Sequence, residues 1–201
     1  TSEDEAPTIV GQSHHYETMA FSGFLTESIE FGSFDVRPGV RIEVFEQERI
    51  DRLAGSTYLD KTTSAILPGV GFISELWGFN FFGGVHRGFT PPSSGALKIL
   101  NFGDNISGGG LDLKAEKSWN KEIGIRGNIS FIQFEYSGYH VAIEDLVAAG
   151  RGTAFKNLGK ANTMGVETKT IFNLSGLNKL LPSVDISYSF LKTEVIEGEI
   201  I

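Results

Sequence analysis

Hydrophobic and polar residues alternate with a period of two along most of this chain. In residues 183–190 the even positions are Val, Ile, Tyr and Phe, and the odd positions are Ser or Asp. Residues 132–137 repeat the pattern, with Ile132, Phe134 and Tyr136 on one side. A period of two is typical of a strand whose two faces meet different environments. The pattern predicts either a sheet that covers a soluble core or a barrel wall that is apolar outside and polar inside.

The alternation predicts an all-β, antiparallel fold with about eight strands, because no long helical period interrupts it. The expected strands are Tyr16–Phe31, Phe34–Glu46, Ala65–Glu75, Phe79–Arg87, Ser118–Arg126, Ile129–Ala142, Thr163–Asn173 and Ser183–Lys192.

The connections between these strands alternate in length. Short turns are expected at Gly32–Ser33, Trp77–Gly78 and Gly127–Asn128, and long connections at Gln47–Ser64, Gly88–Lys117 and Ile143–Asn162. The link Leu174–Pro182 is intermediate. Outer-membrane barrels have short turns at one rim and long loops at the other. A β-sandwich has no reason to sort its connections in this way, so the loop lengths favour the barrel.

Charged residues on the polar sides of the strands fit both alternatives. They would face the lumen of a barrel or the solvent around a sandwich. The set comprises Arg37, Arg41, Glu43, Glu122, Arg126 and Glu167. Aromatic residues near predicted strand ends or on apolar faces are those that an interfacial girdle requires, which again favours the barrel. These aromatic residues are Tyr16, Trp119, Tyr139 and Tyr188.

Composition excludes several classes of function. The 201 residues include no cysteine, so thiolate metal sites and cysteine nucleophiles are ruled out. The net charge of −8 argues against a nucleic-acid partner. Runs of about 18 apolar residues are missing, whereas barrel strands need only about 9–11 alternating ones. Nothing resembles a nucleophile elbow, so we do not expect hydrolase activity.

Five short motifs occur between Pro38 and Glu167. They read PGVRIE from Pro38, LPGVG from Leu67, VHRGFTPP from Val85, LKAEKSWNKEIGIR from Leu113 and NLGKANTMGVE from Asn157. Together, and in this order, they resemble the strand motifs of TonB-dependent outer-membrane receptors. The resemblance is nearest to receptors for ferric citrate and other ferric siderophores.

The resemblance implies a portion of a larger antiparallel transmembrane β-barrel of about 22 strands, filled by a plug. Residues 1–201 would form part of a single barrel domain, with the plug domain, the energy-coupling box and the last strands absent. It further implies a receptor of the bacterial outer membrane that takes up a ferric chelate, energised through TonB. Such a receptor does no covalent chemistry, so the resemblance implies a transporter without a bound cofactor, and not an enzyme. The implied partners are the chelate, outer-membrane lipid, and the TonB complex through the missing N-terminal region.

Candidate ligand residues are expected at loops and rims. Arg87 and Arg151 are cations near loop boundaries, and guanidinium groups pair well with carboxylate-rich chelates. His86 faces the polar side beside Arg87 and is a third candidate. A metal site is not expected, because the adjacent His14 and His15 point to opposite faces of a strand.

Smaller features and two alternatives complete the expectations. Glu122 and Arg126 share a face and could join cross-strand ion pairs, and Gly159 and Gly165 indicate places without room for a side chain or with positive φ. Eight strands can also close a small stand-alone barrel, which would be a passive pore or an adhesin. The remaining alternative is a soluble β-sandwich binding module.

Overall fold

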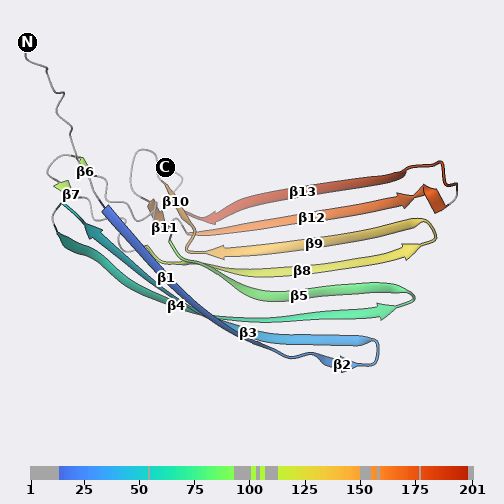
Figure 1. Cartoon of the computed structure of the whole chain (residues 1–201), viewed down its shortest axis with the longest axis horizontal. Coiled ribbons are helices and arrows are strands. Elements are labelled where there is room, and N and C mark those ends of the chain that lie inside the picture. The colour runs from blue at the N-terminus through green and yellow to red at the C-terminus, as the bar shows by residue number, and fades with distance from the viewer. Residues whose placement is uncertain are drawn as a thin grey trace, which may run out of the picture.

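A single curved antiparallel sheet makes up most of the protein (Figure 1). The computed structural model describes residues 14–53, 55–92, 101–102, 105–106, 113–149, 155–157, 159–176 and 178–198. The sheet contains β1 (His14–Thr26), β2 (Ile29–Phe31), β3 (Phe34–Asp51), β4 (Ser56–Leu76), β5 (Phe79–Thr90), β8 (Glu116–Ile129), β9 (Ile132–Glu144), β12 (Lys160–Asn173) and β13 (Ser183–Glu197). Its order is β1-β3-β4-β5-β8-β9-β12-β13, with β2 paired to β3.

Two small hairpins lie outside the main sheet. One pairs β6 (Asn101–Phe102) with β7 (Asn105–Ile106), and the other pairs β10 (Val147–Ala149) with β11 (Phe155–Asn157). A short 3₁₀ turn, η2 (Leu174–Gly176), follows β12. The described residues include no helix long and apolar enough to cross a membrane.

The register of the ladders converts the alternation into two distinct faces. Ile123 lies in one row with Val166 and Phe190, on what we call the apolar face. Glu122 and Tyr139, one position along, lie on the opposite, polar face. The six charged residues expected on the polar side of the strands all lie there, although other charged residues, such as Arg87 and Lys121, lie on the apolar face.

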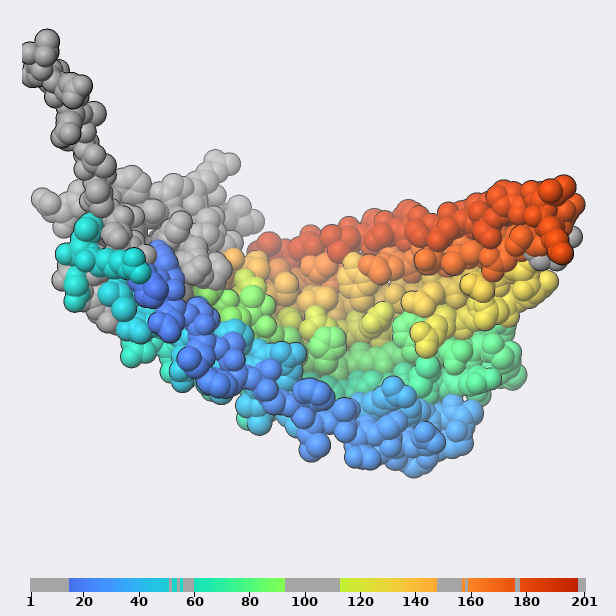
Figure 2. Space-filling view, in the orientation of Figure 1, coloured from blue at the N-terminus to red at the C-terminus, as the bar shows by residue number. Residues whose placement is uncertain are grey.

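The apolar face is open, and the sheet has almost no packed core. The only buried hydrophobic residues in the described part are Leu113, Ala115 and Ala161. By contrast, Ile66 and Ile123 on the apolar face are 69% and 67% exposed. The main sheet is one curved layer (Figure 2), and no second large sheet occurs among the described residues. The β-sandwich alternative is therefore wrong, and the open sheet is a portion of a barrel.

Short turns close one end of the sheet, which we call the turn rim. Gly32 has φ of 66°, and the consecutive Trp77 and Gly78 have φ of 55° and 80°. Two consecutive left-handed residues match the twist of a hairpin. The third turn was expected at Gly127–Asn128, but both residues stay in the β8–β9 ladder. The turn instead forms at Ser130, with φ of 54°, so the expected position was wrong by a few residues.

The opposite end, the loop rim, carries the connections β3–β4, β5–β8 and β9–β12. The expected loop Gln47–Ser64 is wrong, because β3 runs to Asp51 and β4 starts at Ser56. Its residues are mostly polar, with only scattered apolar residues such as Ile50 and Leu59, so they lack apolar alternation, yet their backbones continue the ladder. The other two connections are long, as expected.

One predicted strand is divided. Residues 16–31 form β1 and β2 with a break at Glu27 and Ser28. The amide of Glu27 still donates to the Pro38 carbonyl at 3.1 Å, which keeps the chain beside β3 through the break.

Candidate functional site

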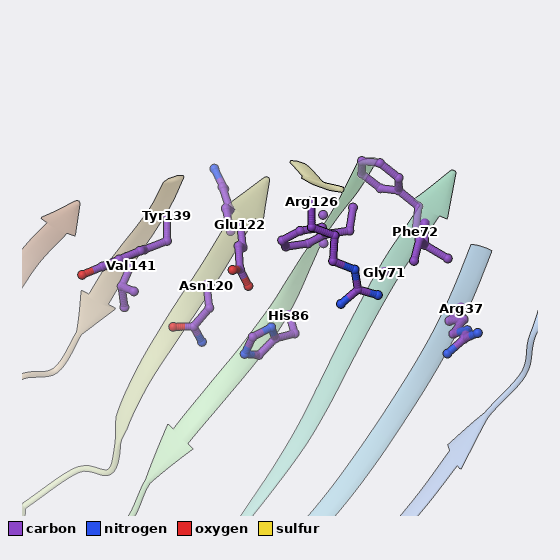
Figure 3. A pocket seen from close by; sticks show the side chains of 14 residues that line it. Arg37, Gly71, Phe72, His86, Asn120, Glu122, Arg126, Tyr139 and Val141 are labelled. Atoms are coloured by element: carbon purple, nitrogen blue, oxygen red, sulfur yellow. The ribbon is translucent and has the colours of Figure 1, made fainter. Parts of the chain in front are cut away.

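A hollow of about 630 Å³ lies on the polar face, across strands β3 to β9. Its polar side chains come from four strands: Arg37 on β3, His86 on β5, Asn120, Glu122 and Arg126 on β8, and Tyr139 on β9. Figure 3 shows these side chains standing on neighbouring strands. Two guanidinium groups, one carboxylate and one imidazole therefore share one surface.

Glycines make room for the larger side chains of this hollow. Gly69 lies opposite His86 in the register, and a Cβ atom on Gly69 would be 2.9 Å from the His86 Cβ. Gly165 lies opposite Tyr139, where a Cβ would be 2.5 Å from the ring. The expectation for Gly165 is thus confirmed, and Gly159 takes φ of 117° as the second expected case.

The two arginines of the hollow are held in different ways. Arg37 donates from Nε and Nη2 to Asp35 Oδ2 at 2.9 and 2.6 Å, and Ser28 Oγ donates to Asp35 Oδ1 at 2.9 Å. Arg126 lies over the ring of Phe82, with its Cζ 5.6 Å from the centroid. Glu122 and Arg126 were each expected to join cross-strand ion pairs, but neither occurs among the ion pairs of the described residues. The Arg126 fork therefore keeps its hydrogen-bond donors for another group.

His86 and Arg87 do not form one site. His86 faces the hollow, whereas Arg87 lies opposite Trp119 on the apolar face. There Arg87 Nη2 is 2.7 Å from Glu144 Oε2, and the guanidinium lies 5.2 Å from the Trp119 ring centroid. Consecutive residues of a strand point to opposite faces, which separates this expected pair. The third candidate, Arg151, lies outside the described residues.

The loop rim is held by side chains that bond the backbone of distant segments. Asn157 Oδ1 accepts from the Lys114 amide at 2.9 Å, and its Nδ2 donates to the carbonyls of Lys114 at 3.0 Å and Asp145 at 2.7 Å. Glu116 Oε1 accepts from the Val147 amide at 2.6 Å. These bonds fasten the β10–β11 hairpin to the segment before β8.

A second pair of bonds ties the β3–β4 hairpin to the β5–β8 connection. Gln47 Nε2 donates to the Pro92 carbonyl at 3.1 Å, and Lys61 Nζ donates to the Leu113 carbonyl at 2.9 Å. Arg49, 2% exposed, lies with its Cζ 4.1 Å from the centroid of the Tyr16 ring. The bases of the loop-rim connections are therefore positioned by the sheet itself.

Sequence reasoning missed Asn120 and Tyr139 as members of the hollow and treated Arg37 and Arg126 as structural. The signal that could have found them is register. Once β5 pairs with β8, Asn120 must lie opposite His86. Groups of three or more His, Asp or Glu side chains that could hold a metal ion do not occur in the described part of the chain.

Comparison with known proteins adds the family. Residues 2–196 match the family model of TonB dependent receptor-like β-barrels. Among solved structures, the chain is similar to the ferric citrate transporter FecA in its unliganded form (19% identity, TM-score 0.71), covering 92% of this chain and 28% of that one. It is also similar to the ferric-catecholate import receptor Fiu from K12 E. coli (18%, TM-score 0.69, covering 94% and 30%). A further match is the copper transporter OprC (20%, TM-score 0.62, covering 89% and 29%).

These matches show a shared fold over a limited part of each neighbour. The chain spans about 28–30% of the length of FecA and Fiu. At identities of 18–20%, these structures show the fold alone. The chain belongs to the TonB-dependent receptor β-barrel family, whose members are outer-membrane proteins of Gram-negative bacteria.

Proposed function

We propose that this chain is part of the wall of a bacterial outer-membrane receptor that takes up a ferric chelate, energised through TonB. The observation that carries the proposal is the hollow on the polar face, which presents Arg37, Arg126 and His86 together. Ferric chelates built on carboxylates or phenolates are anionic. Guanidinium forks recognise such oxygens by charge-assisted, often bidentate hydrogen bonds.

Residues 1–201 would then lie within one barrel domain of a longer receptor. The plug, the contact with the TonB complex and the remaining strands belong, in this proposal, to other parts of that receptor. Lipid of the outer membrane would cover the apolar face, since exposed apolar side chains form a band along the strands.

Whether a residue is a candidate ligand of the chelate depends on whether its side chain lies on the polar or the apolar face of the sheet. His86 remains a candidate, and Arg126 joins it because both line the same hollow. Arg151 stays a prediction. Arg87 also stays a prediction, but its place on the apolar face does not support a contact with a chelate inside the barrel.

Chelate binding by the full-length receptor tests this proposal. We expect ferric citrate or a ferric catecholate to quench tryptophan fluorescence, and Arg126→Gln to weaken the binding by about 10-fold or more, as loss of a charge-assisted hydrogen bond predicts. Lys169→Gln is the matched control, since Lys169 lies on the same face outside the hollow, 3.4 Å from Asp185. Equal losses in both variants would contradict a role for the hollow.

The nature of the cargo and the energy source need separate readouts. Cells that depend on this receptor for iron should grow on the ferric chelate only while the TonB complex is intact. Growth that persists without the TonB complex would favour the passive pore. Binding of copper, and of no ferric chelate, would mean that the proposed ferric cargo is wrong and that copper takes its place. Copper is the alternative to test because the copper transporter OprC is among the similar structures.

The membrane side of the proposal can be tested by paired charge substitutions. Ile123 and Glu122 are neighbours near the middle of β8 on opposite faces. We expect Ile123→Arg to lower the unfolding free energy of the bilayer-inserted receptor by about 2–4 kcal/mol, because the charge meets hydrocarbon. Glu122→Arg should cost far less, because its side chain meets water in the lumen. Equal costs would refute the assignment of the faces.

A further inference from the structure

The sheet splits between β4 and β5 as they approach the loop rim. The β4–β5 ladder covers only Gly69–Leu76 of β4. The β3–β4 ladder continues to Ser56, and the β5–β8 ladder continues to Thr90. β3 and β4 therefore extend beyond the end of β5 (Figure 1). Where the ladder stops, backbone pairing between the two halves ends, although Phe45 of β3 and Phe89 of β5 still contact each other, with ring centroids 5.7 Å apart.

This split opens a crevice of about 540 Å³ on the apolar face. One wall is formed by β3 and β4, with Ile42, Ser64 and Ile66 on the apolar face. The other wall is formed by β5 and β8, with Arg87 and Lys117. Ile42 and Ile66 are 50% and 69% exposed, so an apolar wall faces a basic one.

Contacts within the protein hold the guanidinium of Arg87 in position in the basic wall. Arg87 is 16% exposed and is held by Glu144 and by the Trp119 ring. One Nη contacts Glu144, and a guanidinium has five N–H donors in a fixed fork, so the group can bind a second acceptor. Lys117 lies beside Arg87 on the same face, and Lys121 lies four residues further along β8.

The depth of the crevice is indicated by its aromatic neighbour. Trp119 is 37% exposed on the apolar face, between Lys117 and Lys121. Tryptophan at a membrane surface sits at the level of the lipid headgroups. Arg87 and Lys117 then lie at headgroup depth, while Ile42 and Ile66 continue the apolar band of the sheet.

The charged residues on the apolar side differ between the β3–β4 half of the sheet and the β5–β8 half. On the apolar side of the β3–β4 hairpin, the outermost charged residues are Glu46, Glu48 and Asp60. On β5 and β8 they are Arg87, Lys117 and Lys121, and the acidic residue beside them is Glu144 of β9, which lies opposite Lys117 and pairs with Arg87. The chain as a whole carries a net charge of −8, so the basic wall is a local departure. An anionic group at this depth would be repelled by the first set and attracted by the second.

We propose that this crevice binds a phosphate-bearing membrane lipid. The phosphate group is held by Arg87 and Lys117, and an acyl chain lies along Ile42 and Ile66. The combination of a basic wall and an apolar wall fits an amphiphile better than free phosphate or a neutral lipid, each of which would use one wall alone. The proposal depends on the outward orientation of the apolar face and is independent of the cargo.

Native mass spectrometry of the detergent-solubilised full-length receptor tests the proposal with phosphatidic acid as the probe. We expect the Arg87→Gln/Lys117→Gln double variant to lose roughly 10-fold or more in affinity. Lys117→Gln alone keeps the Arg87–Glu144 pair and should lose a smaller part. Lys192→Gln is the matched control, because Lys192 lies on the apolar face of β13, away from the crevice, 3.8 Å from Glu194.

Each alternative source of binding has its own outcome. Diacylglycerol should bind much more weakly than phosphatidic acid, and inorganic phosphate should not compete at equal concentration. Competition by inorganic phosphate would overturn the lipid assignment. Equal losses of affinity in Lys192→Gln and in the double variant would show that the crevice is not the binding site. So would unchanged binding in a double variant that retains the heat-modifiable gel mobility of the folded barrel.

Discussion

The two rims of the sheet are built by different physical means. At the turn rim, residues with positive φ, such as Gly32, Gly78 and Ser130, reverse the chain within two residues. At the loop rim, side chains bond backbone groups far away in sequence: Asn157 reaches Lys114 across 43 residues, and Lys61 reaches Leu113 across 52. The turn rim is thus specified locally, whereas the loop rim depends on the assembled sheet.

The largest effect should come from the loop rim, with Asn157→Asp. A carboxylate cannot donate the two hydrogen bonds that Asn157 Nδ2 makes, and it would face the carbonyls of Lys114 and Asp145. We expect hydrogen exchange to report a loss of about 1–3 kcal/mol in local opening free energy over residues 113–116 and 145–147. Global unfolding should change much less.

The control for this prediction lies at the turn rim. Asn178 uses its Oδ1 to accept from the Leu180 amide at 3.0 Å, a bond that an aspartate can also make. Asn178→Asp should leave exchange at both rims unchanged. Similar exchange profiles for Asn157→Asp and Asn178→Asp would show that the loop rim does not depend on the Asn157 bonds.

A smaller effect is expected at the turn rim for Gly78→Ala. The residue has φ of 80°, which an L-residue with a Cβ adopts at a cost of about 1 kcal/mol. The urea midpoint of the folded receptor should fall accordingly. Gly138→Ala is the matched control, because its Cβ would have no neighbour closer than 3.8 Å. A larger loss in Gly138→Ala would contradict the assignment of the cost to φ.

The smallest effect should follow from Trp77→Asn in the same turn. Trp77 has φ of 55° and is 86% exposed, so its side chain contributes little packing. Asparagine adopts left-handed conformations more readily than most residues. We expect a gain of a few tenths of a kcal/mol in the same urea experiment. A clear loss would mean that the Trp77 side chain contributes at the turn rim in a way that local conformation does not explain.

The difference between the rims also explains what could be predicted from sequence. Alternation is a local property, so the two faces and the turn at Trp77–Gly78 were foreseen. The turn at Ser130 was missed because glycine and asparagine at 127–128 gave the stronger turn signal, although both remain in the ladder. The mostly polar residues between 47 and 64 show no apolar alternation, so the sequence predicts a loop where the β3–β4 hairpin forms.

The candidate site depended more strongly on long-range structure. The hollow brings together Arg37, His86 and Arg126 from three strands, and only the register places them on one surface. His86 and Arg87 were paired because they are adjacent in sequence, although alternation separates them. No sequence pattern identifies the role of Asn157, since its partners lie on two other segments.

The length of β4 has a consequence for what the cell surface presents. Its 21 residues extend for about 70 Å, or about 50 Å of height at a tilt of about 45°, against an apolar band of about 25 Å. If the long loops lie outside the cell, as they do in outer-membrane barrels, the β3–β4 hairpin stands well above the lipid as a stiff, hydrogen-bonded ribbon. Antibodies, phage tail proteins and proteases would encounter it before the membrane, and its paired backbone would resist cleavage.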